Sequence, residues 1–235
     1  MAIAERQAHQ AGLSGPGTSN TIALTNNPLL GSLVIVTLWM TTNSSAMAVK
    51  DSANNSYTLT PSSPFTDFNN QTQWTAYLLS APANATKTIN FNWTGSDSVT
   101  AYVEEFTVSG GKVTWDKEAT GNGATDPAVL PSITPTVSGS NIIYASSNTA
   151  GGFSHPTAGQ VLSGWTGAGA GITALGSGAE YRFNASGATP VDYTGAGAVA
   201  YGGQANSFTF TPGVSTPPSV VGIVDDYQWI GGSSN

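Results

Sequence analysis

Short apolar runs and alternating runs dominate the first half of the chain and predict β-strands. The run Leu33–Met40 is continuously apolar except for one threonine, rich in β-branched residues and too short to span a bilayer. It therefore predicts a strand buried on both faces, at the centre of a sheet. Over residues 89–94 apolar and polar residues alternate, which places Ile89, Phe91 and Trp93 toward a core and the asparagines between them toward water.

Turn-forming residues separate these runs from one another. The segment 51–56, Asp-Ser-Ala-Asn-Asn-Ser, predicts a hairpin turn between two short strands. No helical period appears, so we expect an all-β fold, an antiparallel β-sandwich. The expected strands are 21–25, 33–40, 46–50, 57–60, 74–79, 88–94 and 99–108, followed in a looser, glycine-rich half by 141–146, 172–175, 180–184 and 207–211.

Glycine and proline divide the chain into three parts. Gly-Pro-Gly at 15–17 sets off an N-terminal arm, residues 1–17, and three prolines within 212–219 predict a stiff linker that begins a C-terminal arm, residues 212–235. Residues 18–211 are expected to form one sandwich domain. Two related half-units, 18–110 and 111–211, are one interpretation, because a Gly-Ser pair precedes an apolar run in both. The alternative is that glycine-rich β sequences resemble one another.

The C-terminal arm carries an apolar and aromatic run beyond its proline-rich linker. Exposed apolar surface of this kind favours contact with a partner. The alternative is that the run folds back as one more edge strand of its own sheet. The candidate partner-binding residues of the two arms are Ile3, Val220, Val221, Ile223, Tyr227, Trp229 and Ile230.

Charge and cysteine content narrow the classes of partner. Only 8% of the 235 residues are charged, the formal net charge is −7, and the six Lys and Arg residues form no cluster. Nucleic acid and anionic membranes are therefore not expected as partners. Cysteine is absent, which excludes disulfides and zinc-thiolate sites. Residues 1–20 contain no apolar core of a secretory signal, so we expect synthesis in the cytoplasm.

Catalytic groups are scattered along the sequence. Glu104 and Glu105 are adjacent on a predicted strand and point to opposite faces, so they cannot act together on one bond, and solvated side chains are expected for them. His9 and His155 lie apart, in the arm and in a glycine-rich loop, without metal-ligand spacing. No Gly-x-Ser-x-Gly motif occurs. We expect no enzyme activity, no cofactor and no metal site.

Two further segments match known motifs only in part. Residues 51–55 offer oxygen ligands for calcium but lack the spaced carboxylates of a calcium-binding loop, so a hairpin turn is the better interpretation. Residues 169–174 fit a relaxed dinucleotide-binding pattern but open no amphipathic helix. Neither segment predicts a ligand.

Tryptophans are the remaining candidates for contact with a sugar. Trp39, Trp74 and Trp93 follow core patterns. Trp115 and Trp165 fall in loop-like segments and are candidate glycan contacts.

Several segments resemble the β-sandwich, jelly-roll-like domains of structural proteins of tailed phages and of some bacterial surface proteins. In the first half these are 31–39, 49–57 and 99–106. In the second half they are the glycine turn 169–174, the aromatic strand 180–183 and the closing strand 207–213, so that the resemblance covers about residues 18–213. It implies a jelly-roll-like sandwich in a virion or cell-surface setting and carries no catalytic residues. The chain departs from these domains in its C-terminal arm and in its low content of charged residues.

The resemblance and the two arms together lead to a functional expectation. The protein would be a non-enzymatic virion protein, a capsid decoration or cement protein, whose partners are the major capsid protein, other virion proteins and neighbouring copies of itself. The alternative is a carbohydrate-binding or adhesin module, such as the receptor-binding domain of a phage tail.

Overall fold

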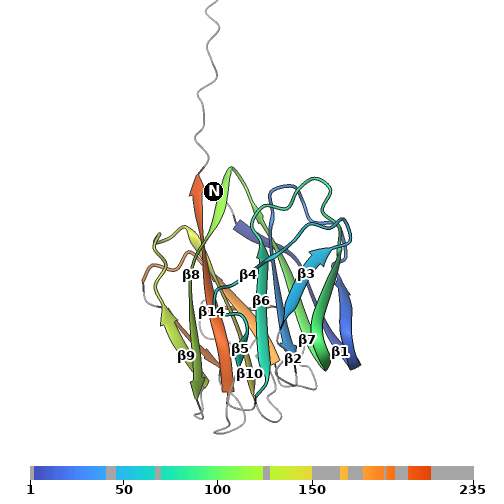
Figure 1. The fold of residues 1–235 in the computed structure, drawn as a ribbon. Coiled ribbons are helices and arrows are strands. Elements are labelled where there is room, and N and C mark those ends of the chain that lie inside the picture. The colour runs from blue at the N-terminus through green and yellow to red at the C-terminus, as the bar shows by residue number, and fades with distance from the viewer. Residues whose placement is uncertain are drawn as a thin grey trace, which may run out of the picture.

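The computed structural model describes residues 3–40, 46–66, 70–123, 128–149, 165–168, 177–187, 189–193 and 201–212. Within these ranges the protein is built from antiparallel strands without a helix, which confirms the expected all-β class (Figure 1). The strands are β1 (Ile3–Ala23), β2 (Leu33–Met40), β3 (Met47–Asp51), β4 (Thr58–Leu59), β5 (Phe65–Thr66), β6 (Thr72–Leu78), β7 (Thr88–Val108), β8 (Gly111–Gly123), β9 (Ala128–Ile133), β10 (Asn141–Thr149), β11 (Thr166–Ala168), β12 (Ser177–Phe183), β13 (Thr189–Tyr193) and β14 (Tyr201–Pro212).

The first sheet has β2 at its centre. Its order is β1-β7-β2-β6-β4, with β3 added to β7 and β5 to β6. All eight residues of β2 are buried, because the strand pairs with β6 and β7 at its two edges and packs against a layer on each face. The interpretation of Leu33–Met40 as a central strand is confirmed.

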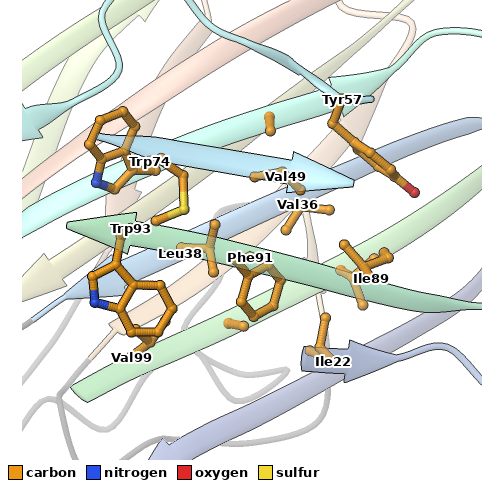
Figure 2. Packing of buried hydrophobic residues seen from close by; sticks show 14 of the residues in the cluster. Ile22, Val36, Leu38, Val49, Tyr57, Trp74, Ile89, Phe91, Trp93 and Val99 are labelled. Atoms are coloured by element: carbon orange, nitrogen blue, oxygen red, sulfur yellow. The ribbon is translucent and has the colours of Figure 1, made fainter. Parts of the chain in front are cut away.

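One long bent strand folds the first sheet over itself. Residues 89–93 of β7 pair with β3, and residues 99–106 pair with β2, with Gly95 at a φ of 97° between them. Ile89, Phe91 and Trp93 point from the first part of β7 toward the face of β2 that carries Val36 and Leu38 (Figure 2). They are buried as the alternation predicts, in an apolar cluster shared by the two layers.

A second sheet, of order β11-β12-β10-β14-β8, covers the other face of the first. Leu33 and Ile35 from β2 meet Ile142 from β10 and Phe208 from β14 in the apolar cluster between the two sheets. The outer face of the second sheet packs against the pair β9 and β13 around a smaller cluster that contains Ile133. The molecule is therefore a sandwich with additional outer layers.

Part of the contact between the sheets is polar. Gln73 and Thr75 of β6 are fully buried. The Gln73 side-chain amide donates to the Ser146 hydroxyl of β10, and the Thr75 hydroxyl donates to Gln204 Oε1 of β14 over 2.7 Å. Gln204 in turn donates to Ser62 Oγ over 2.8 Å. These bonds fix one sheet on the other, because buried polar groups are stable only in the register that pairs them.

Both halves of the chain follow the same pairing plan. β2 lies between β6 and β7, and β10 lies between β12 and β14. β1 pairs with β7 along both of its parts, and in the second half β8 pairs with β14 while β9 pairs with β13. β1 of the first half thus corresponds to β8 and β9 of the second half, and β7 corresponds to β14 and β13. Two related half-units, 18–110 and 111–211, stay one interpretation of the chain.

The structure corrects the expected N-terminal arm. Residues 3–17 belong to β1, and Ile3 pairs with Val108 at the far end of β7. Ile3 packs against the cluster between the sheets, so its apolar side chain is covered by its own chain. The arm was expected because Gly15-Pro16-Gly17 is typical of a chain break, but the structure accommodates this segment as a shift in register between Leu13 and Gly17.

The expected hairpin around 51–56 is confirmed only at its turn. Tyr57 N donates to Val49 O over 3.0 Å, and Lys50 and Ser56 form an isolated bridge. The chain then crosses to the other layer, where β4 pairs with β6 instead of β3. The sequence pattern did not predict β5, β8, β9, β11 and β13, and the expected strand 172–175 lies outside the described residues.

Candidate functional site

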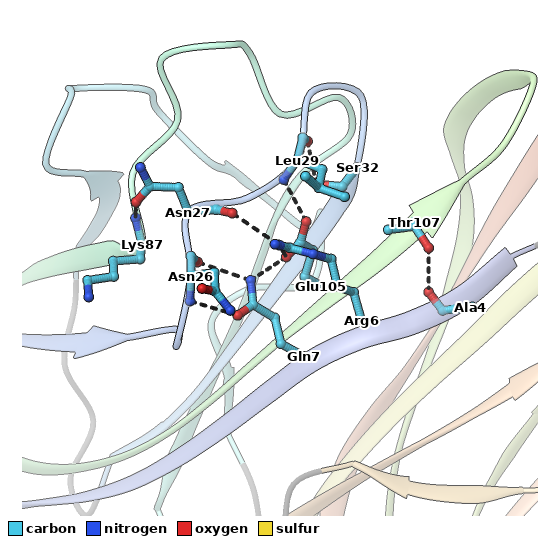
Figure 3. A network of polar contacts seen from close by, with 10 residues as sticks. All are labelled: Ala4, Arg6, Gln7, Asn26, Asn27, Leu29, Ser32, Lys87, Glu105 and Thr107. Atoms are coloured by element: carbon cyan, nitrogen blue, oxygen red, sulfur yellow. Dashed lines mark hydrogen bonds and ion pairs between the residues drawn. The ribbon is translucent and has the colours of Figure 1, made fainter.

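Glu105 is the centre of a buried polar cluster, although a solvated side chain was expected for it. Its side chain is fully buried, and Arg6 Nη1 lies 2.6 Å from Glu105 Oε2 in an ion pair (Figure 3). The Gln7 side-chain amide donates to the same oxygen, and Leu29 N donates to Oε1 over 2.7 Å. The carboxylate is therefore surrounded by donors, which is how a buried charge is stabilised.

A β-bulge brings two consecutive side chains of β1 to this carboxylate. The register passes from Glu5 opposite Phe106 to Gln7 opposite Glu105, so that Arg6 is the extra residue. In a regular strand neighbouring side chains point to opposite faces, whereas a bulge turns two of them to the same side. Arg6 and Gln7 consequently converge on Glu105, while Glu5 points to the other face.

The same cluster fastens the loop between β1 and β2. Arg6 Nη1 donates to Asn27 O and Gln7 Nε2 to Asn26 O, each over 3.0 Å, and Asn26 N donates back to Gln7 Oε1 (Figure 3). These contacts join three segments that lie far apart in sequence. Their arrangement supports a structural role for Glu105, with all of its neighbours supplied by its own chain.

Glu104 occupies the opposite face of β7, between the two sheets. It stands across from Ile35 in β2 and is fully buried. Burial raises the pKa of Glu104 to about 8, a rise that hydrogen bonding by Tyr144 opposes and the negative charge of Glu5 increases. Glu104 is therefore mainly protonated at neutral pH, which lowers the free-energy cost of keeping a carboxyl group in an apolar layer.

Glu5 and Tyr181 complete the surroundings of Glu104. The Tyr181 hydroxyl donates to Glu5 Oε2, and burial together with Glu5 raises the pKa of Tyr181. Tyr181 also stacks edge-on against Phe106, with ring centroids 5.1 Å apart. The carboxyl group of Glu104 thus lies within the packed interior and not in a cleft, whereas Glu5 is only partly buried. A substrate does not reach such groups, so the burial of Glu104 and Glu105 speaks against a catalytic role.

Outside the core, an open polar concavity of about 390 Å³ lies on the outer face of the first sheet. It crosses three strands, because Lys50 of β3 stands opposite Asn90 of β7, which stands opposite Thr21 of β1. The neighbouring row contributes Asn92 and Ser19. Its lining is thus made mainly of amides and hydroxyls, together with the ammonium group of Lys50, the carboxylate of Asp51 and Phe91.

Asp51 holds one wall of this polar concavity. Its Oδ1 accepts from Ala53 N and Asn55 N, each over 2.9 Å, and its Oδ2 accepts from Asn55 Nδ2 and from Thr86 N. Four donors on one carboxylate fix the turn in which Asn54 adopts a φ of 66°. All four donors belong to the protein, so Asp51 is the acceptor that holds this turn, which is the role predicted in preference to calcium binding.

The two tryptophans considered for glycan contact do not lie in open loops. Trp115 lies in β8, half-buried against the cluster between the sheets, and Trp165 is only 8% exposed in the outer cluster of the second sheet. Stacking on a sugar needs an accessible ring face. The burial of Trp165 therefore corrects its expected exposure, and neither position supports an aromatic sugar platform.

Several sequence-based candidates fall outside the residues that the structure describes. Among them are His155, the segment 169–174 and the six partner-binding candidates Val220, Val221, Ile223, Tyr227, Trp229 and Ile230. In the described ranges no three His, Asp or Glu side chains gather into a possible metal site. The same ranges hold no helix long and apolar enough to cross a membrane. His9 is exposed on β1.

Comparison with known proteins adds no relative to these observations. No protein-family model matches the chain, and no curated protein matches it.

Proposed function

We propose that the protein is a non-enzymatic structural component of a virion, a capsid decoration or cement protein that bridges neighbouring subunits of a shell. The resemblance to jelly-roll-like domains of phage structural proteins supports this setting. The buried acid groups support a non-catalytic role, because Glu104 and Glu105 are enclosed by their own chain.

The observation that carries the proposal is the position of the first and the last described residue. Ile3 pairs with Val108 and Pro212 pairs with Gly111, and a two-residue turn joins the strands of Val108 and Gly111. The first described residue and the last one therefore lie at the same end of the sandwich (Figure 1). In sequence, the proline-rich linker begins at Pro212, and the apolar residues follow it.

A folded body whose first and last described residues lie at the same end suits a bridging protein. The sandwich would stand on the shell, and residues 220–230 would bury their apolar side chains against a neighbouring subunit or another copy of the chain. A surface poor in charge favours neutral, hydrogen-bonded contacts between closely packed copies. Since residues 3–17 already pair with β7 as part of β1, the C-terminal arm alone would provide this attachment.

The experiment compares the full chain with a version that ends at Gly213. In purified particles that carry the protein, the full chain should be present in hundreds of copies, on the order expected of a shell component, and the shortened chain should be lost from particles while its melting temperature stays unchanged. Trp229→Ala should give a partial loss. If shortening the chain unfolds the body while the full chain stays monomeric and binds no shell, the C-terminal arm is an internal strand and the proposal fails.

The carbohydrate-binding alternative keeps one supporting observation. The tryptophans no longer favour it, but the polar concavity across β3, β7 and β1 does. An adhesin or receptor-binding module would present that face to glycans, and a small number of copies per particle would distinguish it from a shell component.

A further inference from the structure

We propose that the polar concavity across β3, β7 and β1 binds a saccharide that carries a carboxylate, with Lys50 receiving the carboxylate and Asn54 and Asn92 receiving hydroxyl groups. This inference deepens the carbohydrate-binding alternative. It can hold whether or not the C-terminal arm attaches the protein to a shell, and it is tested on the isolated protein.

The floor of the concavity is firm. Phe91 beneath it is fully buried in the cluster between the layers of the first sheet (Figure 2). One wall is the turn that Asp51 fixes through four accepted hydrogen bonds. A concavity whose floor and wall are already ordered loses little conformational entropy when it binds a ligand.

The polar groups of the concavity are available. Within the described part of the chain, no hydrogen bond or ion pair occupies the side chains of Lys50, Asn54 and Asn92, which are all exposed. Asn90 donates only over 3.4 Å, to Ser52 Oγ. An amide offers both donors and an acceptor, which suits the hydroxyl groups of a sugar.

Charge decides between a neutral and an acidic saccharide. Asp51 and Lys50 are the ionisable residues of the lining. The carboxylate of Asp51 is enclosed by donors, whereas the ammonium group of Lys50 is free to bind. An ammonium group beside amide donors favours an anionic group over a neutral one. Since no aromatic ring face is accessible here, we expect weak binding, with a Kd of about 1 mM.

The experiment is a titration of the full chain, labelled with ¹⁵N, with trigalacturonate and with the uncharged galactotriose. We expect trigalacturonate to shift the amide signals of β3 and of residues 88–93 and to bind about fivefold more tightly than galactotriose. Lys50→Gln should remove this preference, and Asn92→Ala should weaken the binding of both sugars. Higher salt should weaken the binding of trigalacturonate only.

Lys112→Gln is the matched control, because Lys112 is an exposed lysine of β8 in the other sheet and its substitution changes the net charge equally. It should leave both affinities unchanged. The proposal is overturned if trigalacturonate does not bind, if galactotriose binds as tightly, if Lys50→Gln has no effect, or if Lys112→Gln weakens binding as much as Lys50→Gln. None of these results bears on attachment through residues 220–230.

Discussion

Glu104 and Glu105 are consecutive in β7, yet their fully buried carboxyl groups lie on opposite faces of one sheet in opposite chemical settings. Glu105 faces the Arg6 guanidinium and the Gln7 amide of the bulged β1 strand. Glu104 lies between the sheets, where burial raises its pKa to about 8. Burial of Glu105 is thus stabilised by the Arg6 ion pair, and burial of Glu104 is stabilised because its carboxyl group keeps its proton.

The raised pKa of Glu104 predicts that stability falls with pH over a defined window. The unfolded chain releases the proton near the ordinary pKa of 4.5 and the folded chain near 8. Between these values the folded state holds one proton more, so the free energy of unfolding contributed by this group decreases as pH rises, and it is constant above about 8.

Glu104→Gln tests that window. The glutamine side chain is nearly isosteric and does not ionise, so the stability of the variant does not fall as pH rises through this window. The variant should therefore match the parent at pH 5 and be more stable than the parent at pH 9. Urea unfolding of both proteins across this range measures the difference between their free energies of unfolding. The other titrating groups, including the facing Glu5, Tyr144 and Tyr181, are present in both proteins, so their contributions largely cancel in this difference. A difference that stays constant with pH would mean that Glu104 is ionised in the folded protein throughout.

Breaking the Arg6–Glu105 pair should destabilise the fold. Arg6→Met leaves Glu105 charged and fully buried, at an expected cost of about 2 to 3 kcal/mol in the free energy of unfolding. Glu105→Gln should cost less, because it leaves no unpaired charge in the interior and Arg6, which loses its partner, is partly exposed. A double-mutant cycle with both changes measures the coupling by denaturant unfolding. Additive effects would contradict the arrangement in which the bulge joins these residues.

Ile35→Asp should be among the most damaging single changes. Ile35 is fully buried and stands directly opposite Glu104, so the change places a second carboxyl group in the same apolar layer. We expect a loss of about 4 kcal/mol or more. Thermal melting followed by circular dichroism measures it, with Thr58→Asp on the exposed side of β4 as the control. An unchanged melting temperature for Ile35→Asp would refute the central position of β2.

Asp51→Ala should destabilise the turn that forms a wall of the polar concavity. The change removes the acceptor of four hydrogen bonds, three within the turn and one to Thr86 N, at an expected cost of about 2 to 4 kcal/mol. Ser52→Ala is the neighbouring control, since its hydroxyl donates only over 3.4 Å to Thr88 O. Denaturant unfolding compares the two. If Asp51→Ala and Ser52→Ala lowered the free energy of unfolding by the same small amount, the turn would be held by backbone contacts and not by the Asp51 carboxylate.

The apolar frame could be predicted from the sequence because local spacing decides it. A continuous apolar run such as Leu33–Met40 indicates a strand buried on both faces. An alternating pattern such as Ile89, Phe91 and Trp93 indicates a strand buried on one face. Both predictions are confirmed. The boundary at Gly95 was seen as a turn between two strands, whereas the structure keeps one bent strand through it.

The buried acid groups could not be predicted in the same way. Glu104 and Glu105 look like solvated positions from their neighbours alone. The residues that bury and neutralise Glu105 lie about a hundred positions earlier, and they reach it only because of a bulge that local pattern does not reveal. Trp165 is a similar case, since the residues that cover it, among them Ile133, Ile143 and Ala205, come from strands that are not adjacent to it in sequence.

The pairing of Ile3 with Val108 also sets a condition on biosynthesis. β1 leaves the ribosome before β7, and the end of β7 that pairs with Ile3 is translated only after roughly a hundred further residues. During that interval a long strand with few charges has unsatisfied backbone groups and can pair with other nascent chains. Folding yield should therefore depend on translation speed, temperature and chaperone supply more strongly than the stability of the finished protein does.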